Sequence, residues 1–324
     1  VYFGLRRGGR QMYALDISDP DSPSFLWRIS DEEDGFEELG QTWSVPVVTR
    51  IPGYEDDEGY PKQVLIFGAG YDPVKDDHDT LAVTTSDGMG RGIFIVDAVT
   101  GEKVWSVTPA ANSNNNLQET GLIHSVPAAV TPLDSNGDGV TDRIYFGDTG
   151  GNLWRIDMPL DALPSSSQST WRIVKMFAAN GGTRRTDRRF FSAPDVVRTT
   201  ADNTPVDAIL IGTGDRTNPA EKDDATDLTR PSVDNQFYMI RDKHVNPYFS
   251  ALDSSLCLTE PEHDFRCGLP MTPSSLYNAT DNLLQTGNAE QKEAAAESLS
   301  EASGWLINLL ANGEKSLAES LTID

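Results

Sequence analysis

Short apolar runs separated by clusters of turn-forming residues recur along the whole chain. Examples are 64–68, 93–97 and 143–147, each rich in Val, Ile, Phe or Tyr and each ending in Gly or Asp. Short runs of β-branched and aromatic residues bounded in this way are typical of β-strands. No apolar run approaches the ~18 residues that a membrane-spanning helix requires. The hydrophobic pattern therefore predicts an all-β protein with no membrane span.

The apolar runs are organised in a repeat. Its first part is Ser-x-Pro followed by small apolar residues, at 43–48, 124–130 and 191–197. After a loop comes a run that ends in Gly, at 64–68, 143–147 and 208–212. A third run ends in Asp, at 92–97, 152–157 and 236–242. A fourth run with Trp follows twice, at 103–107 and 170–174.

Repeated units of four short antiparallel strands are typical of β-propeller blades. Residues 1–4, 11–16 and 25–29 would supply part of another unit, and 304–309 and 314–317 would add strands at the end. We therefore predict a β-propeller of about four units, fewer than many propellers contain. A β-sandwich is the alternative, but it does not explain the repeated Ser-x-Pro phrase.

The whole chain, 1–324, is expected to form this single propeller domain. It opens directly in a strand-like run, so we expect a fragment of a longer precursor. Residues 245–303 interrupt the last unit as a long insertion, and 289–303 within it are rich in Ala, Glu and Leu. That composition predicts an amphipathic helix. Long loops on a rigid scaffold are where binding usually resides.

The chain is strongly acidic, with 50 acidic and 26 basic residues and a net charge of −24. This balance argues against nucleic acid, which requires a basic face, and against charge-driven binding to an anionic membrane. It suits an exported protein without assigning a compartment. Cys257 and Cys267 lie in a loop-like stretch, and in an exported protein such a pair indicates a local disulfide. Two free thiols are the alternative.

Residues 134–142 carry the most specific motif of the chain, D-x-N-x-D-G-x-x-D. Calcium binds six to eight oxygen atoms in a flexible shell. Side-chain oxygens at loop positions 1, 3, 5 and 9 and a backbone carbonyl at position 7 would come from Asp134, Asn136, Asp138, Asp142 and Val140. Gly139 at position 6 permits the sharp turn around an ion. The loop therefore predicts a Ca²⁺ site, against the alternative of a plain polar turn.

The loop is not an EF-hand, because Tyr145 stands where a bidentate Glu would be at position 12 and strand-like runs flank it. We expect it to join two antiparallel strands of one blade. The corresponding acidic segments of the neighbouring units, 55–58 and 201–207, lack the ligand spacing. The repeat thus predicts a single dedicated site rather than one in every blade.

Several phrases resemble known propeller families. Residues 96–105 resemble the D-x-x-T-G-x-x-x-W phrase of quinoprotein-like blades, in which Thr-Gly makes a turn and Trp105 would pack between blades. A more specific combination resembles the C-terminal propeller of the PilY family, the tip-associated proteins of type IV pili related to the neisserial PilC adhesins. Its parts are 13–20, Leu26 and Trp27, Ser44 to Pro46, and the loop running into 142–155. The resemblance covers most of the chain and is weakest in 245–303.

The PilY resemblance implies a modified propeller of seven blades and a calcium site with the same five ligands in this loop. It implies a role in pilus biogenesis, surface adhesion and control of retraction, with calcium occupancy as a switch. The implied partners are pilus tip components such as minor pilins, and host or abiotic surfaces. The implied location is the pilus tip, cell surface or outer membrane of a Gram-negative bacterium.

Two other functional classes remain open. A calcium-dependent quinoprotein (PQQ) dehydrogenase would have a similar propeller, but such enzymes commonly carry adjacent cysteines and a calcium ion open to the central channel. An integrin-like propeller would repeat its calcium loop across blades. No hydrolase constellation stands out, because the histidines are scattered at His78, His124, His244 and His263. We therefore assign no catalytic residue and expect a protein that is not an enzyme.

Overall fold

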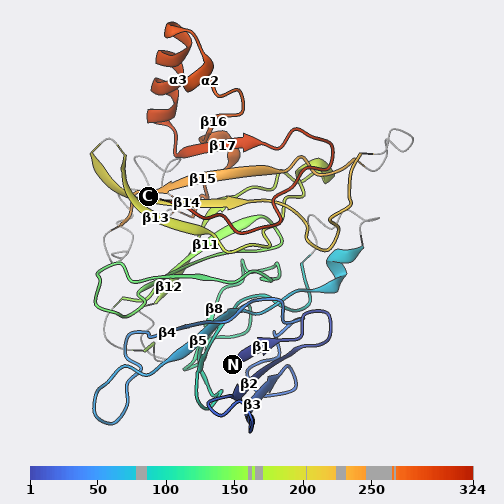
Figure 1. The fold of residues 1–324 in the computed structure, drawn as a ribbon, viewed down its shortest axis with the longest axis vertical. Coiled ribbons are helices and arrows are strands. Elements are labelled where there is room, and N and C mark those ends of the chain that lie inside the picture. Colours follow the sequence, from blue (N-terminus) through green and yellow to red (C-terminus); the bar gives the residue numbers. More distant parts are fainter. Residues whose placement is uncertain are drawn as a thin grey trace.

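The computed structural model describes residues 1–77, 86–159, 163–164, 171–201, 203–223, 231–245, 265 and 268–323. Their strands form four sheets, which follow one another along the chain and lie one above the next in Figure 1. Within the sheets, every strand pair is antiparallel except β7 with β8 and β16 with β17. The predicted all-β fold, a modified β-propeller, is confirmed, and the described sheets contain three, five, four and five strands in chain order.

Each sheet follows the strand order of one sequence repeat. The first contains β1 (Tyr2–Gly4), β2 (Gln11–Asp16) and β3 (Ser24–Ser30). The second contains β4 (Val47–Thr49), β5 (Val64–Gly68), β6 (Ile93–Asp97), β7 (Lys103–Thr108) and β8 (Asn116–Gln118). The third contains β9 (Thr131–Leu133), β10 (Arg143–Gly147), β11 (Asn152–Asp157) and β12 (Arg172–Ala178). The fourth contains β13 (Asp195–Ala201), β14 (Thr204–Gly212), β15 (Gln236–Asp242), β17 (Gly304–Asn308) and β16 (Tyr277–Asn278).

The core lies between the faces of neighbouring sheets. Every residue of β5 is buried, and its successive side chains point alternately to the two sides. Leu65 and Phe67 pack toward the first sheet, and Val64 and Ile66 pack toward the third. A strand with both faces covered reads as a continuous apolar run. This packing explains why the central strands of the repeat show no polar alternation.

Trp105 of β7 packs between blades, as predicted. Its side chain is buried and meets Trp171, which precedes β12, with 4.8 Å between ring centroids. The preceding Gly101 has a φ of +76°, and a Cβ atom there would lie 2.7 Å from the ring of Trp27. Glycine is therefore required at this turn by both its backbone conformation and the close approach.

The Ser-x-Pro phrase of the third unit does not form the strand expected at 126–130. The first strand of that sheet is β9, which begins at Thr131. The amide of Val126 instead donates to the carbonyl of Gly90, and its carbonyl accepts from the amide of Gly70, both in the second unit. Pro127 has no N–H to offer a sheet. The phrase thus connects neighbouring blades.

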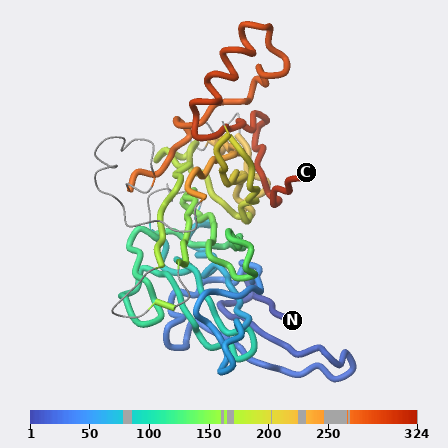
Figure 2. The backbone as a smooth tube through the Cα atoms, turned by 90° about the vertical axis from the view of Figure 1, so that its left-hand side faces the viewer, coloured from blue at the N-terminus to red at the C-terminus, as the bar shows by residue number. Residues whose placement is uncertain are grey.

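In the part of the insertion that the structure describes, α2 (Leu283–Thr286) and α3 (Ala289–Glu301) project from the fourth sheet in Figures 1 and 2. Helix α3 lies where 289–303 predicts one, and Asn288 caps it by accepting from the amide of Gln291. The expected amphipathic character is wrong, because Ala295 is the one buried residue of α3. No helix among the described residues is long and apolar enough to cross a membrane.

Short 3-10 helices among the described residues are η1 (Pro73–Asp76), η3 (Arg184–Thr186) and η5 (Pro273–Ser275). Residues 314–317 do not form the expected strand; the amide of Ser316 donates one hydrogen bond to the carbonyl of Thr213. Cys257, Cys267, His78 and His263 lie outside the described residues. The predicted disulfide therefore stays a prediction.

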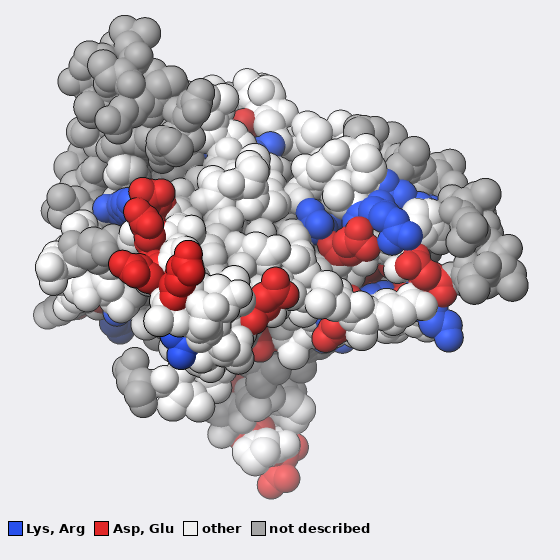
Figure 3. All heavy atoms as spheres, turned by 90° about the horizontal axis from the view of Figure 1, so that it is seen from above, with Lys and Arg blue, Asp and Glu red and all other residues white. Residues whose placement is uncertain are grey.

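Figure 3 shows the molecule from the end that carries the helices. On the described part of that face, acidic side chains lie in several separate groups, with basic side chains beside some of them. This face presents no continuous basic surface of the kind that nucleic acid binding requires. The distribution agrees with the net charge of −24.

Candidate metal centre at the edge of the third sheet

The motif at 134–142 forms the loop between β9 and β10. The two strands are antiparallel, and Leu133 pairs with Arg143 directly at the ends of the loop, as the sequence predicts. Gly137 and Gly139 have φ values of +80° and +87°. Only glycine adopts this conformation without a steric penalty. The two glycines therefore permit the chain to curl back on itself over a few residues.

The loop curls around the carboxylate of Asp134. The amides of Gly137 and Gly139 donate to its two oxygens at 2.6 and 2.7 Å, and the amide of Asp138 donates at 3.1 Å. The side-chain amide of Asn136 donates to the carboxylate of Asp138 at 2.9 Å. Loop amides thus hold the carboxylate at position 1 inside the turn.

The last motif residue, Asp142, is buried at the base of the loop. Its carboxylate accepts hydrogen bonds from the amide of Ser135 at 3.2 Å and from the hydroxyl of Ser135 at 2.7 Å. Burial raises the pKa of Asp142, and the charge of Asp134 acts in the same direction, although the hydrogen bonds from Ser135 oppose both. A cation beside Asp142 would favour its charged form.

The loop touches the sheets on both sides of its own. The amide of Thr141 donates to the carbonyl of Arg50 at 2.8 Å, next to β4 of the second sheet. The guanidinium of Arg198, in β13 of the fourth sheet, donates to the carbonyl of Ser135 at 3.0 Å. Contacts from three sheets therefore fix the position of this loop.

A cavity of about 80 Å³ adjoins the loop. Four of the five predicted ligands line it: Asn136, Asp138, Val140 and Asp142. Asp134 does not line the cavity. Among the described residues, no three acidic, histidine or cysteine side chains are gathered closely enough to hold a metal ion. The structure thus brings four of the five residues around one space without converging their carboxylates.

The residues present nevertheless fit a calcium ion in their chemistry. The side chains at the loop offer carboxylate and amide oxygens, which a hard cation prefers, and calcium tolerates irregular coordination. Within the described part of the chain, the hydrogen bonds of Asn136, Asp138 and Val140 all join them to other residues of this loop. Such local hydrogen bonds can be exchanged for metal contacts without unfolding the hairpin.

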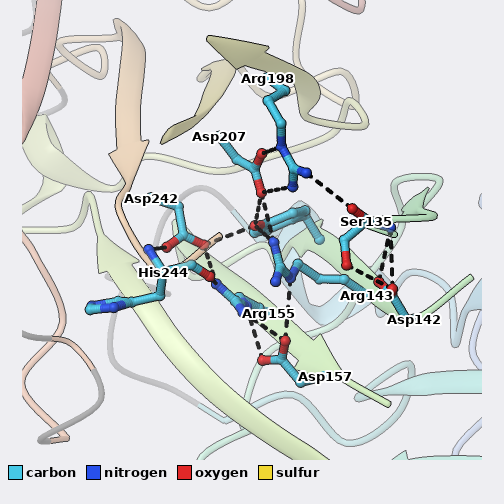
Figure 4. A network of polar contacts seen from close by, with 10 residues as sticks. Ser135, Asp142, Arg143, Arg155, Asp157, Arg198, Asp207, Asp242 and His244 are labelled. Carbon is cyan, nitrogen blue, oxygen red and sulfur yellow. Dashed lines mark hydrogen bonds and ion pairs between the residues drawn. The ribbon is translucent and has the colours of Figure 1, made fainter. Parts of the chain in front are cut away.

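Behind the loop lies a buried ionic network that the sequence did not reveal (Figure 4). Arg143 of β10 lies 3.2 Å from Asp157 and 2.7 Å from Asp207. Arg155 of β11 lies 2.7 Å from Asp157 and also pairs with Asp242. All five side chains are at most 1% exposed. The network joins the third sheet to the fourth.

Ion pairing keeps the buried Arg155 and Asp242 charged, because it outweighs the effect of burial on their pKa values. Burial disfavours the charged form of Arg155, but Asp242 and Asp157 outweigh it and raise the pKa of Arg155. Burial likewise opposes the charged form of Asp242, but Arg155 outweighs it and lowers the pKa of Asp242. The partly exposed Arg198 extends the network to the loop, because its Nε donates to Asp207 at 3.0 Å.

The other polar residues of interest brace turns. Asp148 accepts from the amide of Gly150 and from the indole of Trp154, both at 2.8 Å. His124 is buried, with its Nδ1 3.3 Å from the ammonium of Lys75, which pairs with Asp87 at 3.2 Å. Burial lowers the pKa of His124. Both Asp148 and His124 therefore have buried partners, as expected for structural rather than catalytic groups.

No protein-family model matches the chain. Among curated proteins, it is 30% identical over 156 residues to the type IV pilus biogenesis factor PilY1 of Pseudomonas aeruginosa, a match covering 48% of this chain and 11% of PilY1. It is 27% identical over 165 residues to a PilY1 homologue of Xylella fastidiosa, covering 48% of this chain and 9% of the homologue. The matches thus span about a tenth of these relatives.

A solved structure shares the fold. The crystal structure of the Pseudomonas aeruginosa PilY1 C-terminal domain matches with a TM-score of 0.58 and 18% identity, over 96% of this chain and 59% of that one. At this identity the structural match bears on the fold alone. The sequence matches to PilY1 proteins come from a separate comparison and agree with it. The chain is therefore similar to PilY1 proteins over about half of its length and shares the fold of the PilY1 C-terminal domain.

Proposed function

We propose that this chain acts in the biogenesis of type IV pili as a binding and assembly domain rather than as an enzyme. The observation that carries the proposal is the sequence match to proteins named type IV pilus biogenesis factors. The proposed location is the pilus tip or cell surface of a Gram-negative bacterium. The proposed partners are pilus tip components such as minor pilins, together with host or abiotic surfaces. Retraction control and surface adhesion belong to the same proposal.

The second part of the proposal is a calcium site in the loop between β9 and β10. Its ligands would be Asp134, Asn136, Asp138, the carbonyl of Val140 and Asp142. Four of these five line one cavity, and glycines permit the turn. Calcium would supply the positive charge that offsets repulsion among three carboxylates. Because the loop contacts three sheets, calcium bound in it would rigidify the region where these sheets meet.

Calcium titration of the whole chain tests this part directly. Binding to the folded state alone stabilises it by RT ln(1 + [L]/Kd), about 2.7 kcal/mol at a hundredfold excess over Kd. We expect calcium to raise the melting temperature of the wild type and to raise that of Asp138→Asn much less. Asp57→Asn is the matched control, since Asp57 does not line the cavity. Equal melting curves in calcium and in chelator would refute the site.

The pilus proposal needs a test in cells. Strains carrying Asp138→Asn or Asp57→Asn in the full-length protein would be compared for surface piliation and for retraction. We expect Asp138→Asn to alter retraction at unchanged protein level, and Asp57→Asn to behave as the wild type. A purified protein with a quinone absorption band would instead favour the dehydrogenase alternative.

A further inference from the structure

A glutamate from the neighbouring sheet borders the proposed calcium site. Glu55 lies in the loop between β4 and β5 of the second sheet, yet it lines the same 80 Å³ cavity as Asn136, Asp138 and Asp142. In sequence, Glu55 and the motif are far apart. The cavity therefore combines groups from two blades.

The backbone at Glu55 is held in place by a small hairpin. The amide of Asp56 donates to the carbonyl of Tyr60, and the amide of Lys62 donates to the carbonyl of Tyr54, both at 2.9 Å. Tyr54 and Lys62 are in turn anchored to the buried Asp97 of β6, each at 2.6 Å. These contacts with the second sheet thus fix the position of the Glu55 backbone.

The side chain of Glu55 is also available. It is exposed, and within the described part of the chain its carboxylate makes no hydrogen bond or ion pair. The neighbouring Asp56 differs, because its carboxylate accepts from the amides of Glu58 and Tyr60. Of this acidic loop, Glu55 is the member that lines the cavity.

The motif itself lacks one strong ligand. Calcium loops of the EF-hand type end in a bidentate Glu at position 12, and Tyr145 occupies that position here. The five proposed ligands of the loop fall short of the six to eight oxygens that calcium takes. A carboxylate arriving from another element would fill this deficit.

We infer that Glu55 is a further ligand of the calcium site and completes it from the second sheet. The inference rests on the proposed function of the loop. The exposed Glu55 side chain has the freedom to turn toward an ion in the cavity that it lines. The ion would then link the second and third sheets, beside the existing hydrogen bond from Thr141 to Arg50.

Calorimetric titration of the whole chain with calcium chloride tests the inference. Wild type would be compared with Glu55→Gln, Glu58→Gln and Asp138→Asn. Affinity depends on the number of charged ligands, so we expect Glu55→Gln to weaken binding about tenfold or more. Glu58→Gln removes the same charge from the same loop but does not line the cavity, so we expect a change of less than about threefold.

Hydrogen exchange supplies a second readout. In the wild type, calcium is expected to slow exchange at the amides of 54–62 as well as at those of 134–142. In Glu55→Gln, only the protection at 134–142 should remain. Equal affinities for Glu55→Gln and Glu58→Gln, with Asp138→Asn weakened, would overturn the role of Glu55 and leave the loop site standing. No calcium binding by the wild type would overturn both proposals.

Discussion

The β10–β11 hairpin has two faces that meet their neighbours in different ways. Toward the second sheet it presents Ile144, Phe146, Trp154 and Ile156, all in one apolar cluster. Toward the fourth sheet it presents Arg143, Tyr145, Arg155 and Asp157, which form the buried ionic network. Successive side chains of a strand point to opposite faces. Alternation along two short strands therefore makes one blade interface apolar and the other partly ionic.

The apolar and the partly ionic interface are stabilised in different ways. An apolar interface gains free energy in proportion to the area removed from water, whatever its partner's sequence. A buried ion pair gains little over a well-packed apolar pair, but removal of one partner leaves an uncompensated charge. The interface with the fourth sheet is therefore selective for its partner, since Asp207 and Asp242 of that sheet supply counter-charges to the two arginines.

The largest expected effect comes from Arg155→Met. The change leaves the buried Asp242 without its arginine, whereas Asp157 keeps its ion pair with Arg143. Breaking a buried pair in this way destabilises by about 3–5 kcal/mol. The measurement is urea unfolding at neutral pH, with the exposed Arg28→Met as control. The carboxylate of Asp242 would then have a raised pKa, so the deficit should shrink as the pH falls and it takes up a proton.

Trp105→Phe in the apolar interface provides the counterpart. We expect a loss of about 1–3 kcal/mol from the reduced contact with Trp171. No charged group is removed, so this deficit should be the same at pH 7 and pH 5. If the Arg155→Met deficit were equally independent of pH, the distinction between the two interfaces would be wrong.

Titration of the buried His124 is expected to make the stability of the protein depend on pH, with an effect of intermediate size. His124 lies beside Lys75 and near Asp148. Burial lowers the pKa of His124; the charge of Asp148 opposes this shift, and the charge of Lys75 adds to it. When the pKa of a histidine is lower in the folded state than in the unfolded state, its full contribution to the free energy of unfolding is present above the unfolded-state pKa of about 6.5. That stability is lost as the pH falls toward the folded pKa.

Thermal unfolding between pH 7.5 and pH 5.5 checks this expectation. The melting temperature of the wild type should fall over that range, and His124→Gln should show a smaller fall because its side chain does not titrate. His124→Gln would be compared with wild type at pH 7.5 to separate its effect on packing. Parallel curves for the two proteins would mean that His124 is not the titrating group.

These features differ in how far the sequence could reveal them. Strand positions and the role of Trp105 follow from local apolar runs and a turn phrase. The loop at 134–142 follows from local spacing. The ionic network could not be predicted, because Asp207 and Asp242 lie in the fourth sheet and meet the two arginines only in the tertiary fold. Glu55 was seen as part of an acidic loop, and only the packing of two sheets places it beside the motif.

The smallest expected effect concerns Arg198, the residue that joins the loop to the ionic interface. Its side chain is 44% exposed, and it pairs with Asp207 while donating to the carbonyl of Ser135. A partly exposed ion pair contributes about 0–1 kcal/mol. We therefore expect Arg198→Met to lower the free energy of unfolding by less than about 1 kcal/mol, with the exposed Arg172→Met as control.

Calcium makes the Arg198 variant more informative than its small effect suggests. The carbonyl of Ser135 is not a proposed ligand, so the melting-temperature gain on adding calcium should be the same for Arg198→Met and wild type. A reduced gain would mean that the loop and the interface with the fourth sheet respond to the ion together. The ionic interface would then contribute to calcium binding as well as to the selective pairing of the third and fourth sheets. The reason is that Asp207 pairs with Arg143 and also holds Arg198 against the loop.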